Sequence, residues 1–339
     1  MKIQQNISLK EYNTFGINSK ASEFIEINSK NEVIDFIKSN NLNEKPHLIL
    51  GGGSNILLTQ DFDGLVIKNN IKGIKVEENE SSIKLNVGAG EDWHQLVMFC
   101  IENKYAGIEN LSLIPGCVGA SPMQNIGAYG VEVKDVITQV GAIDIESGEE
   151  KVFSNKECEF GYRTSVFKTN LKGKYFITCV EFQLSKTPDF KVSYGDIKKQ
   201  LAKNGVNEVD LSIKAVSDAV IAIRERKLPN PKEIGNSGSF FKNPIITKAE
   251  FDELKVVYKD MPAYELPQGG YKVAAGWLIE RAGWKGYTDG NYGVHKNQAL
   301  VLVNYGDASG KMIYNLSERI VRDIRRRFGI ELEREVNII

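Results

Sequence analysis

The sequence has few of the residues from which disulfide frameworks and metal centres are built. It contains four cysteines and three histidines. The cysteines form no Cys-x-x-Cys pair and stand among apolar or small neighbours, as buried thiols do; they are Cys100, Cys117, Cys158 and Cys179. The pattern favours neither a disulfide framework nor a zinc site, and three scattered histidines do not build a metal centre alone.

A strong charge bias and long apolar runs are absent as well. Lys and Arg (43) balance Asp and Glu (44), so no field of the whole chain would attract nucleic acid or an anionic membrane. The first seven residues lack the apolar segment of a signal peptide, and no later run has the length that a bilayer requires. We therefore expect a cytoplasmic protein without nucleic-acid or membrane partners, and the sequence predicts no protein partner.

What is present indicates a mixed α/β chain. A length of 339 residues is long for one hydrophobic core, so two or three domains are expected. A strand over Phe24–Ile27 precedes a helix whose capping box is Ser29 with Glu32, and a buried strand follows over His47–Leu50. This order predicts a small α/β unit.

The next part of the chain changes to a β pattern. Leu65–Ile67, Ile74–Val76 and Ile83–Val87 alternate as half-exposed antiparallel strands do. A helix is predicted over Trp93–Ile101. Gly88-Ala-Gly90 before it is no Rossmann fingerprint, because the third glycine would fall on the bulky Trp93.

The second half of the sequence continues with strands and amphipathic helices. Strands are predicted over Val136–Ile145 and Phe176–Leu184. A helix over Ile213–Arg224 ends at two prolines, which predicts that a new domain begins near Leu228. The later predicted elements are a helix that ends at Tyr258, a helix near Val273–Glu280 and a strand over Gln298–Val303. A final amphipathic helix is predicted, with Gly329 after its last turn. The residues on its apolar face are Met312, Leu316, Ile320, Ile324 and Phe328. Glu331, Glu333 and Glu335 then alternate along a predicted strand, and periodicity alone favours a solvated acidic face for all three.

The most unusual stretch is the uncharged run Ile114–Gly130. Between Glu109 and Glu132 there is no charged side chain, and the run is rich in glycine. Backbone N–H groups together with Ser121, Gln124 and Asn125 offer donors without net charge, which suits an anionic ligand held by fixed dipoles. The alternative is a long surface loop, which rarely excludes Lys and Glu while keeping apolar residues.

A second candidate site is the glycine turn after the strand His47–Leu50. Gly51, Gly52 and Gly53 let the backbone lie against a ligand that a Cβ atom would repel, and Ser54 and Asn55 can add side-chain hydrogen bonds. The alternative is a tight turn without a ligand. A P-loop is excluded, since no Gly-Lys-Ser/Thr follows.

Two further segments carry candidate residues. Arg163 is flanked by Phe160, Tyr162, Val166 and Phe167, which predicts a partly dry guanidinium that needs an anionic partner. A structural ion pair is the alternative. The second segment is a polar, glycine-broken run, 235–244, that contains Ser239.

Several of these motifs, in this order, resemble one family. They are Tyr12-Asn-Thr-Phe-Gly16, Gly51-Gly-Gly-Ser-Asn55, Ile114-Pro-Gly-Cys-Val-Gly119, Gln124-Asn-Ile-Gly-Ala-Tyr-Gly130, Phe160-Gly-Tyr-Arg163, Lys227-Leu-Pro229 and Gly238-Ser-Phe-Phe-Lys-Asn-Pro244. Together they strongly resemble UDP-N-acetylenolpyruvoylglucosamine reductase, in the longer form that carries a tyrosine loop. The resemblance implies an FAD enzyme that uses NADPH to reduce the enolpyruvyl ether of a UDP-sugar during peptidoglycan precursor synthesis.

The resemblance also implies a domain plan. The expected α/β (α+β) architecture has a two-part FAD-binding module and a separate α+β substrate-binding domain. The expected bounds are 1–69 with 320–339 for the first FAD-binding part, 70–227 for the second and 228–319 for the substrate domain.

Residue roles follow from the matched positions. Ser239 matches the proton donor, Arg163 the carboxylate-binding arginine and Glu335 the catalytic glutamate near the C-terminus. Tyr194, Lys227, Asn243 and Gln298 match positions that contact substrate. The expected FAD contacts are Gly51, Gly52, Gly53, Ser54, Asn55, Pro115, Gly116, Ser121, Gln124, Asn125, Gly127 and Ala128.

One position departs from the family pattern, and two other functions stay open. The family pattern Glu-Pro-Glu-Val is Glu333-Arg-Glu-Val336 in this chain, so the segment that carries Glu335 lacks the rigidity of a proline. A flavin oxidase or dehydrogenase acting on a hydroxy acid or sugar would explain the glycine loops. A non-catalytic protein that binds FAD or a UDP-sugar would explain them too.

Overall fold

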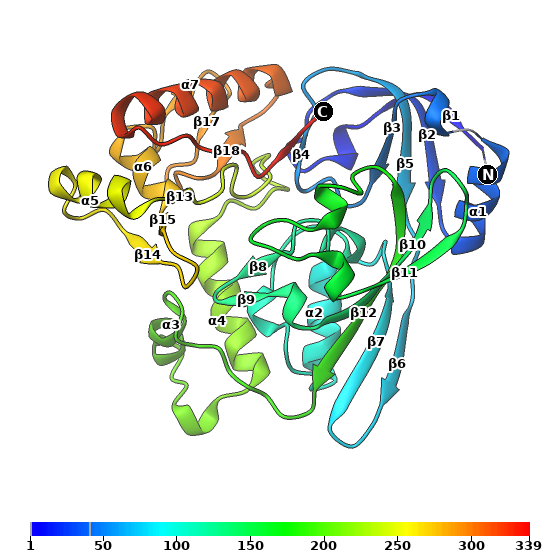
Figure 1. Ribbon diagram of the computed structural model, residues 1–339, viewed down its shortest axis with the longest axis horizontal. Helices are drawn as coiled ribbons and strands as arrows, with labels where there is room; N and C mark the ends of the chain where they lie inside the picture. The colour runs from blue at the N-terminus through cyan, green and yellow to red at the C-terminus, as the bar shows by residue number, and fades with distance from the viewer. Residues whose placement is uncertain (1, 41) are drawn as a thin grey trace. The chain divides into compact units, whose positions relative to one another are not determined.

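The computed structural model describes residues 2–40 and 42–339 (Figure 1). By its internal contacts the chain divides into two compact units. The first comprises Ala21–Gly53, Asp63–Arg226 and the segment that ends at Ile7, and the second comprises Ser8–Lys20, Ser54–Phe62 and Lys227–Ile339. No helix in the described part of the chain combines the length and the apolar character that a membrane crossing requires.

The first unit opens with a four-stranded sheet that α1 (Lys30–Ser39) covers. The strands, in spatial order, are β1 (Gln4–Ser8), β2 (Lys20–Ile27), β5 (Phe62–Asn69) and β3 (His47–Leu50). The predicted start of α1 is confirmed in part: Ser29 accepts a hydrogen bond from the Glu32 amide (3.2 Å), but the Glu32 carboxylate accepts from the Asn28 amide and not from Ser29.

The prediction that Leu65–Ile67 forms a half-exposed antiparallel strand is wrong. These residues belong to β5, which is parallel to β3 in the first sheet and does not join the antiparallel strands that follow. Leu65, Val66 and Ile67 are all buried, so both faces of β5 are covered. A continuous apolar run is typical of such a strand, and the sequence Leu-Val-Ile has no polar residue to mark a solvated face.

A five-stranded antiparallel sheet forms the rest of the core of the first unit (Figure 1). In spatial order its strands are β11 (Glu150–Ser154), β10 (Ile137–Asp144), β12 (Tyr175–Ser185), β7 (Ser82–Gly88) and β6 (Ile74–Glu78). The predicted helix is α2 (Trp93–Glu102), whose Trp93 ring lies 6.0 Å from that of Phe182. Edge strand β11 was not predicted, because Phe153 is its only buried residue and the apolar pattern is therefore too weak.

Two helices complete the first unit. They are α3 (Ile197–Lys203) and α4 (Ile213–Lys227), and they pack through Ile197, Leu201 and Val220. The predicted helix over Ile213–Arg224 is confirmed and extends by one turn. A two-residue hairpin pairing joins β8 (Gly127–Ala128), near the end of the uncharged run, to β9 (Val131–Glu132), which follows it.

The second unit is built from short elements. Its strands are β13 (Ile245–Ile246), β14 (Ala263–Glu265) and β15 (Tyr271–Val273) in one sheet, β16 (Thr288–Asp289), β17 (Tyr292–Val294) and β18 (Leu302–Asn304) in another, and β4 (Ile56–Leu57) paired in parallel with β19 (Asn337–Ile338). The helix expected near Val273 begins only at Ala275, because Val273 ends β15. Of the strand predicted over Gln298–Val303, only the last residues belong to β18.

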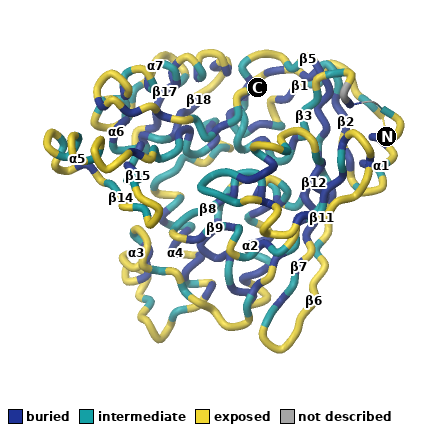
Figure 2. The backbone as a smooth tube through the Cα atoms, viewed as in Figure 1, coloured by how far each residue is buried: buried dark blue, intermediate teal, exposed yellow. Residues whose placement is uncertain are grey.

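Three helices accompany these strands: α5 (Lys248–Val257), α6 (Ala275–Arg281) and α7 (Gly310–Phe328). Helix α5 has no buried residue, and its tube is largely exposed in Figure 2. Its aromatic contact is a stack of Phe251 on Tyr271, with ring centroids 3.9 Å apart.

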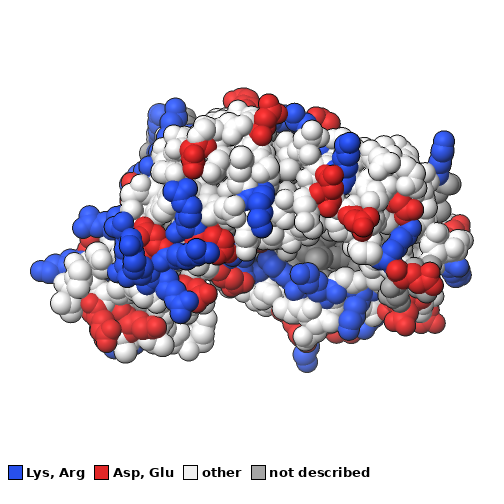
Figure 3. All heavy atoms as spheres, turned by 90° about the horizontal axis from the view of Figure 1, so that it is seen from above, with Lys and Arg blue, Asp and Glu red and all other residues white. Residues whose placement is uncertain are grey.

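Helix α7 matches the expected amphipathic pattern except at its start. Ser309 caps it, and Gly329 ends it with φ 70° in the left-handed region, as predicted for a residue at that position. Met312 is 46% exposed, so its placement on the buried face was wrong, and Ile313 lies there instead. Figure 3 shows basic side chains gathered with acidic ones between them at the left of the view, over the C-terminal end of α7.

The C-terminal segment after α7 is not the regular strand that the sequence predicted. Within 330–336 the structure has only an isolated bridge between Arg334 and Phe241, and strand β19 starts at Asn337. The side chains of Glu331 and Glu333 are 71% and 70% exposed, which fits a solvated face. Glu335 differs, because it is half-buried.

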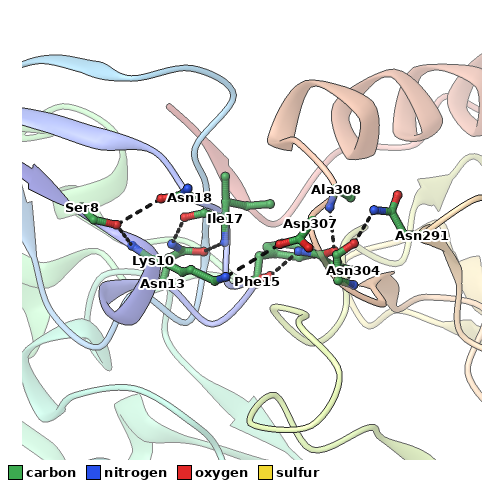
Figure 4. Close-up of polar contacts among 11 residues, drawn as sticks. Ser8, Lys10, Asn13, Phe15, Ile17, Asn18, Asn291, Asn304, Asp307 and Ala308 are labelled. Carbon is green, nitrogen blue, oxygen red and sulfur yellow. Dashed lines mark hydrogen bonds and ion pairs between the residues drawn. The ribbon is translucent and has the colours of Figure 1, made fainter.

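Buried asparagines tie the segment 8–20 into the second unit (Figure 4). The amide group of Asn13 donates to the carbonyls of Leu9 (2.7 Å) and Ile17 (2.9 Å). Asn304, at the end of β18, donates to the Phe15 carbonyl at 2.9 Å. The motif Tyr12–Gly16 is thus part of the second unit, although Phe15 and Asn304 are 289 residues apart in the sequence.

Candidate active site

In the first unit, the two glycine-rich segments that the sequence singled out lie against each other. A Cβ atom on Gly52 would lie 2.8 Å from the Gly116 Cα atom, which real Cβ atoms essentially never do. Gly53 (φ 62°) and Gly116 (φ 120°) both adopt the left-handed conformations that favour glycine. The glycines therefore allow a close backbone approach between the turn after β3 and the start of the uncharged run.

This contact predicts different costs for two neighbouring substitutions. Gly52→Ala should lower the stability of the apo-protein by about 1–3 kcal/mol, because the backbone of 116–117 must move. Gly51→Ala is the matched control: its Cβ atom would meet Cys117 Cβ at 3.6 Å, an ordinary contact. Thermal unfolding of both variants tests this, and equal melting temperatures for the two would contradict it.

The uncharged run is held by backbone hydrogen bonds and by Asn125. The amides of Val118 and Gly119 donate to the carbonyls of Glu91 and Ala89 at 2.8 Å each. Fully buried Asn125 donates through Nδ2 to the Gly161 carbonyl (3.0 Å) and accepts through Oδ1 from the Lys134 amide. Its side chain therefore braces the loop.

Ser121 differs from Asn125. Its Oγ atom is buried and takes part in no hydrogen bond among the described residues. A buried hydroxyl without a bond costs free energy unless some other group satisfies it. The Ser121 hydroxyl is thus a polar group of this loop that remains available to a ligand.

His94 anchors the backbone at Leu113, just before the uncharged run. Its Nδ1 atom accepts a hydrogen bond from the Leu113 amide at 3.0 Å, so this nitrogen carries no proton. Burial lowers the pKa of His94; the nearby carboxylate of Asp92 opposes that shift, and Arg224 adds to it.

A histidine with a lowered folded pKa should destabilise the protein in acid. The unfolded chain takes up the proton near the ordinary histidine value of about 6.5 while the folded chain resists it, so stability falls as pH drops below that value. His94→Asn keeps an acceptor in place of Nδ1 and cannot be protonated there, so we expect its stability to vary less between pH 7.5 and 5.5. Urea unfolding at several pH values tests this, and parallel curves for the two proteins would refute the assignment.

Arg163 occupies a strained and partly buried position in the first unit. Its φ is 54°, which is uncommon for a residue with a side chain. Its guanidinium donates to the carbonyl of Gly127 (2.6 Å) and lies 3.5 Å from that of Asn125. A Cβ atom on Gly127 would come within 2.8 Å of the Arg163 Nη1 atom, so the glycine makes room for the arginine.

Tyr194 lies beside the far end of the uncharged run. A Cβ atom on Gly130 (φ 83°) would be 3.3 Å from the Tyr194 Cβ atom. The Tyr194 side chain is 49% exposed, and Asn110 secures both segments by donating to the carbonyls of Tyr129 and Lys191. The first unit thus places Arg163 and Tyr194 at the β8–β9 end of the run.

In the second unit, the loop that carries Ser239 is fixed by the motif Tyr12–Gly16. A Cβ atom on Gly235 would lie 2.2 Å from the Phe15 carbonyl oxygen, and Gly235 exchanges backbone hydrogen bonds with Asn304. Asn236, 2% exposed, donates through its backbone to Thr14 and accepts from the Gly238 amide through Oδ1. The sequence did not predict this support, although Asn236 between two glycines of the run was a signal for it.

The same unit brings Ser239 and Glu335 onto adjoining backbone segments. Ser239 forms a bridge with Val301, and the Glu335 amide donates to the Phe240 carbonyl at 2.9 Å. Asn55 joins them from the glycine turn, because its Nδ2 atom donates to the Glu335 carbonyl at 3.3 Å. Three residues predicted from separate motifs therefore lie in one part of this unit.

Asn243, Gln298 and Lys227 also belong to the second unit. The Asn243 Oδ1 atom accepts from the Ala275 amide (3.0 Å) at the start of α6. The Gln298 Oε1 atom accepts from the Leu300 amide (3.3 Å), in the segment whose Leu300 carbonyl binds the Phe240 amide. Lys227 is the last residue of α4. Gln298 is thus connected to the Ser239 segment, whereas Asn243 caps a helix.

Comparison with known proteins identifies the family. The model of the C-terminal domain of UDP-N-acetylenolpyruvoylglucosamine reductase matches residues 230–339, and an FAD binding domain matches 21–154. A protein of that name from Flavobacterium johnsoniae is 52% identical over the whole of both chains. The chain belongs to the UDP-N-acetylenolpyruvoylglucosamine reductase family. The reductase of Pseudomonas putida is 47% identical and covers 99% of this chain and 98% of its own.

A solved structure supports the fold. UDP-N-acetylenolpyruvylglucosamine reductase from Thermus caldophilus superposes with a TM-score of 0.67 over 100% of this chain and 99% of its own, at 22% identity. The resemblance drawn from the motifs is confirmed, and so is the α/β architecture with an FAD-binding part and a C-terminal domain.

The family uses FAD and NADPH, and residues of the first unit fit an FAD. Gly52 and Gly116 let the two glycine-rich segments approach closely, and the buried Ser121 hydroxyl takes part in no hydrogen bond among the described residues. Uncharged donors of this kind suit the pyrophosphate of a dinucleotide. The FAD binding domain model covers all three residues.

Proposed function

We propose that this chain catalyses the NADPH-dependent reduction of UDP-N-acetylglucosamine enolpyruvate to UDP-N-acetylmuramate, a step of peptidoglycan precursor synthesis. The observation that carries this proposal is the 52% identity over the full length to a reductase of that name. FAD, when bound, supplies the hydride chemistry between NADPH and the enolpyruvyl ether. The protein binds the substrate, orients it and supplies the second hydrogen as a proton.

Arg163 is the residue that we assign to the substrate carboxylate. Hydride addition to the vinyl group leaves negative charge on the carbon beside the carboxylate, so a fixed cation there stabilises the transition state most. A guanidinium can bind a carboxylate through two parallel hydrogen bonds, which strengthen as charge grows. The bond from Arg163 to the Gly127 carbonyl supports this assignment, because it fixes the plane of the guanidinium beforehand.

Ser239 is the proton donor in this proposal. A hydroxyl is a weak acid, but the acceptor is a strongly basic carbanion, and the Lys227 ammonium is a candidate to stabilise the alkoxide. Glu335 would act in its protonated form as a hydrogen-bond donor, since two adjacent carboxylates resist joint ionisation. The backbone bond from Glu335 to Phe240 supports a joint role of Ser239 and Glu335.

The remaining predicted residues are assigned to binding. Tyr194, Lys227, Asn243 and Gln298 would contact the UDP-sugar. The FAD contacts would come from 51–55 and 115–128, in a two-part module of 1–69 with 320–339 and 70–227, and the substrate domain would be 228–319. The cytoplasm is the proposed location, because the UDP-sugar and NADPH are both soluble metabolites, and neither nucleic acid nor a membrane is a proposed partner.

One anaerobic experiment distinguishes this function from the other two. The purified protein, loaded with FAD, is mixed with NADPH while the flavin absorbance is followed, and the enolpyruvyl UDP-sugar is then added. We expect bleaching followed by recovery that depends on the UDP-sugar. Recovery only on admission of oxygen would indicate an oxidase, and no bleaching would indicate a binding protein.

A further inference from the structure

Arg334, next to the proposed catalytic Glu335, reaches from the C-terminal segment to helix α7. Its Nε atom donates to the Ser317 hydroxyl at 2.9 Å, and its Nη2 atom binds the Glu318 carboxylate. Its guanidinium also lies over the Tyr314 ring, 5.0 Å from the centroid. One side chain therefore contacts three residues on one stretch of α7.

The receiving side chains are themselves fixed. Ser317 is fully buried, and its hydroxyl donates to the Tyr314 carbonyl at 2.7 Å. Burial works to raise the pKa of the Glu318 carboxyl, but the Tyr314 hydroxyl and the guanidinium groups of Arg334 and Arg322 outweigh it and lower the pKa. Arg334 is thus bound by an ionised carboxylate and a buried hydroxyl, with its own side chain only 21% exposed.

The backbone on either side of Arg334 carries the link to the active-site segments. Arg334 and Phe241 form an isolated bridge, and the hydrogen bonds that flank it run from the Lys242 amide to the Glu333 carbonyl and from the Glu335 amide to the Phe240 carbonyl, each 2.9 Å long. An isolated bridge of this kind has no regular strand to support it. The Arg334 side chain supplies that support from α7, which is the longest helix of the unit.

We infer that Arg334 is a positioning residue for Glu335. By binding Ser317, Glu318 and Tyr314, its side chain holds the segment 333–335 against Phe240–Lys242 and keeps Glu335 in register with Ser239. This inference rests on the proposed function. It assigns a role to the residue at which the chain departs from the family pattern: a side-chain anchor takes the place of a rigid backbone.

The test combines hydrogen exchange with kinetics of the half-reactions. In Arg334→Met we expect the Glu335 amide to lose protection from exchange, because the segment is no longer anchored. We expect NADPH to bleach the flavin at the wild-type rate and the substrate-dependent recovery to slow on the order of tenfold, as for a displaced catalytic group. In a Glu335→Ala background the same substitution should slow recovery less than about twofold, since the effect acts through Glu335.

Arg322→Met is the matched control. Arg322 also pairs with Glu318, at 3.7 Å, but its side chain is 78% exposed and has no hydrogen bond or ion pair to the C-terminal segment among the described residues. The Arg322→Met substitution should change neither the hydrogen-exchange rate of the Glu335 amide nor the rate of either half-reaction by more than about twofold. Unchanged protection and recovery in Arg334→Met, or equal slowing with and without Glu335, would overturn the inference. A wild-type protein that never recovers with substrate would instead refute the proposed function, and the exchange measurement would still decide whether Arg334 anchors Glu335.

Discussion

Ser239→Ala should separate the two half-reactions. NADPH should bleach the flavin of this variant at the wild-type rate, whereas recovery with the enolpyruvyl UDP-sugar should slow by about 10²-fold or more, the usual contribution of a general acid. The reason is that the proton is needed only after hydride has reached the substrate. Anaerobic stopped-flow absorbance measures both rates in one preparation.

The structure supplies a control for this variant two residues earlier. Ser237 is buried, whereas Ser239 is partly exposed, and the Ser237 hydroxyl takes part in no hydrogen bond among the described residues. Ser237→Ala therefore removes a hydroxyl from the same loop, which Asn236 and Asn304 hold in place, without removing the proposed acid. Its two half-reactions should match those of the wild type.

A third variant tests whether the hydroxyl acts as an acid or only as a spacer. Ser239→Cys keeps a side chain of similar size with an exchangeable proton, so it should recover part of the rate lost in Ser239→Ala. Equal slowing of flavin bleaching and recovery in Ser239→Ala would remove Ser239 from the proton-transfer step. It would mean that the substitution disturbs the loop as a whole.

The sequence predicted the elements whose patterns are local and strong. Helix α7 has an apolar residue at nearly every fourth position and a glycine after its last turn, and both were recognised. The prediction that Met312 lies on the buried face of this helix is wrong, because the buried position is the next residue, Ile313. Strand β5 failed for a different reason: burial of both faces erases the alternation on which the prediction depended.

The candidate residues were recognised as motifs, but their supports were not. Those supports depend on pairs that are distant in the sequence, such as Asn304 with Phe15 and Arg334 with Ser317. No periodicity encodes such a pair, because each partner is an ordinary polar or apolar residue in its own segment. The same holds for Asn125, whose side chain turned out to brace the uncharged run.

Glu335 illustrates where pattern and structure differ. Alternation placed it on one solvated face with Glu331 and Glu333, since all three are spaced by two residues. The segment is not a regular strand, the Glu335 amide donates to the Phe240 carbonyl, and Glu335 is half-buried. A half-buried carboxylate among exposed ones is the kind of local exception that marks candidate functional residues.

Arg163→Lys should be nearly as damaging as the loss of Ser239, although it keeps the charge. Lysine presents a point charge without a planar fork, so it cannot hold a carboxylate through two parallel bonds and bind the Gly127 carbonyl at the same time. We expect the substrate-dependent recovery to slow by about 10²-fold, since the lost bonds strengthen in the transition state. Single-turnover recovery at several substrate concentrations measures the change in rate and in affinity separately.

The size of the two changes indicates where the arginine acts. If its fork stabilises the growing negative charge, the maximal rate of recovery should fall more than the affinity for substrate, and Arg163→Met should fall further because the charge is lost too. Arg322→Lys, an exposed exchange of the same type on α7, should leave both quantities unchanged. A loss of affinity alone in Arg163→Lys would mean that Arg163 binds substrate and transition state equally, because an interaction of equal strength in both cannot accelerate the chemical step.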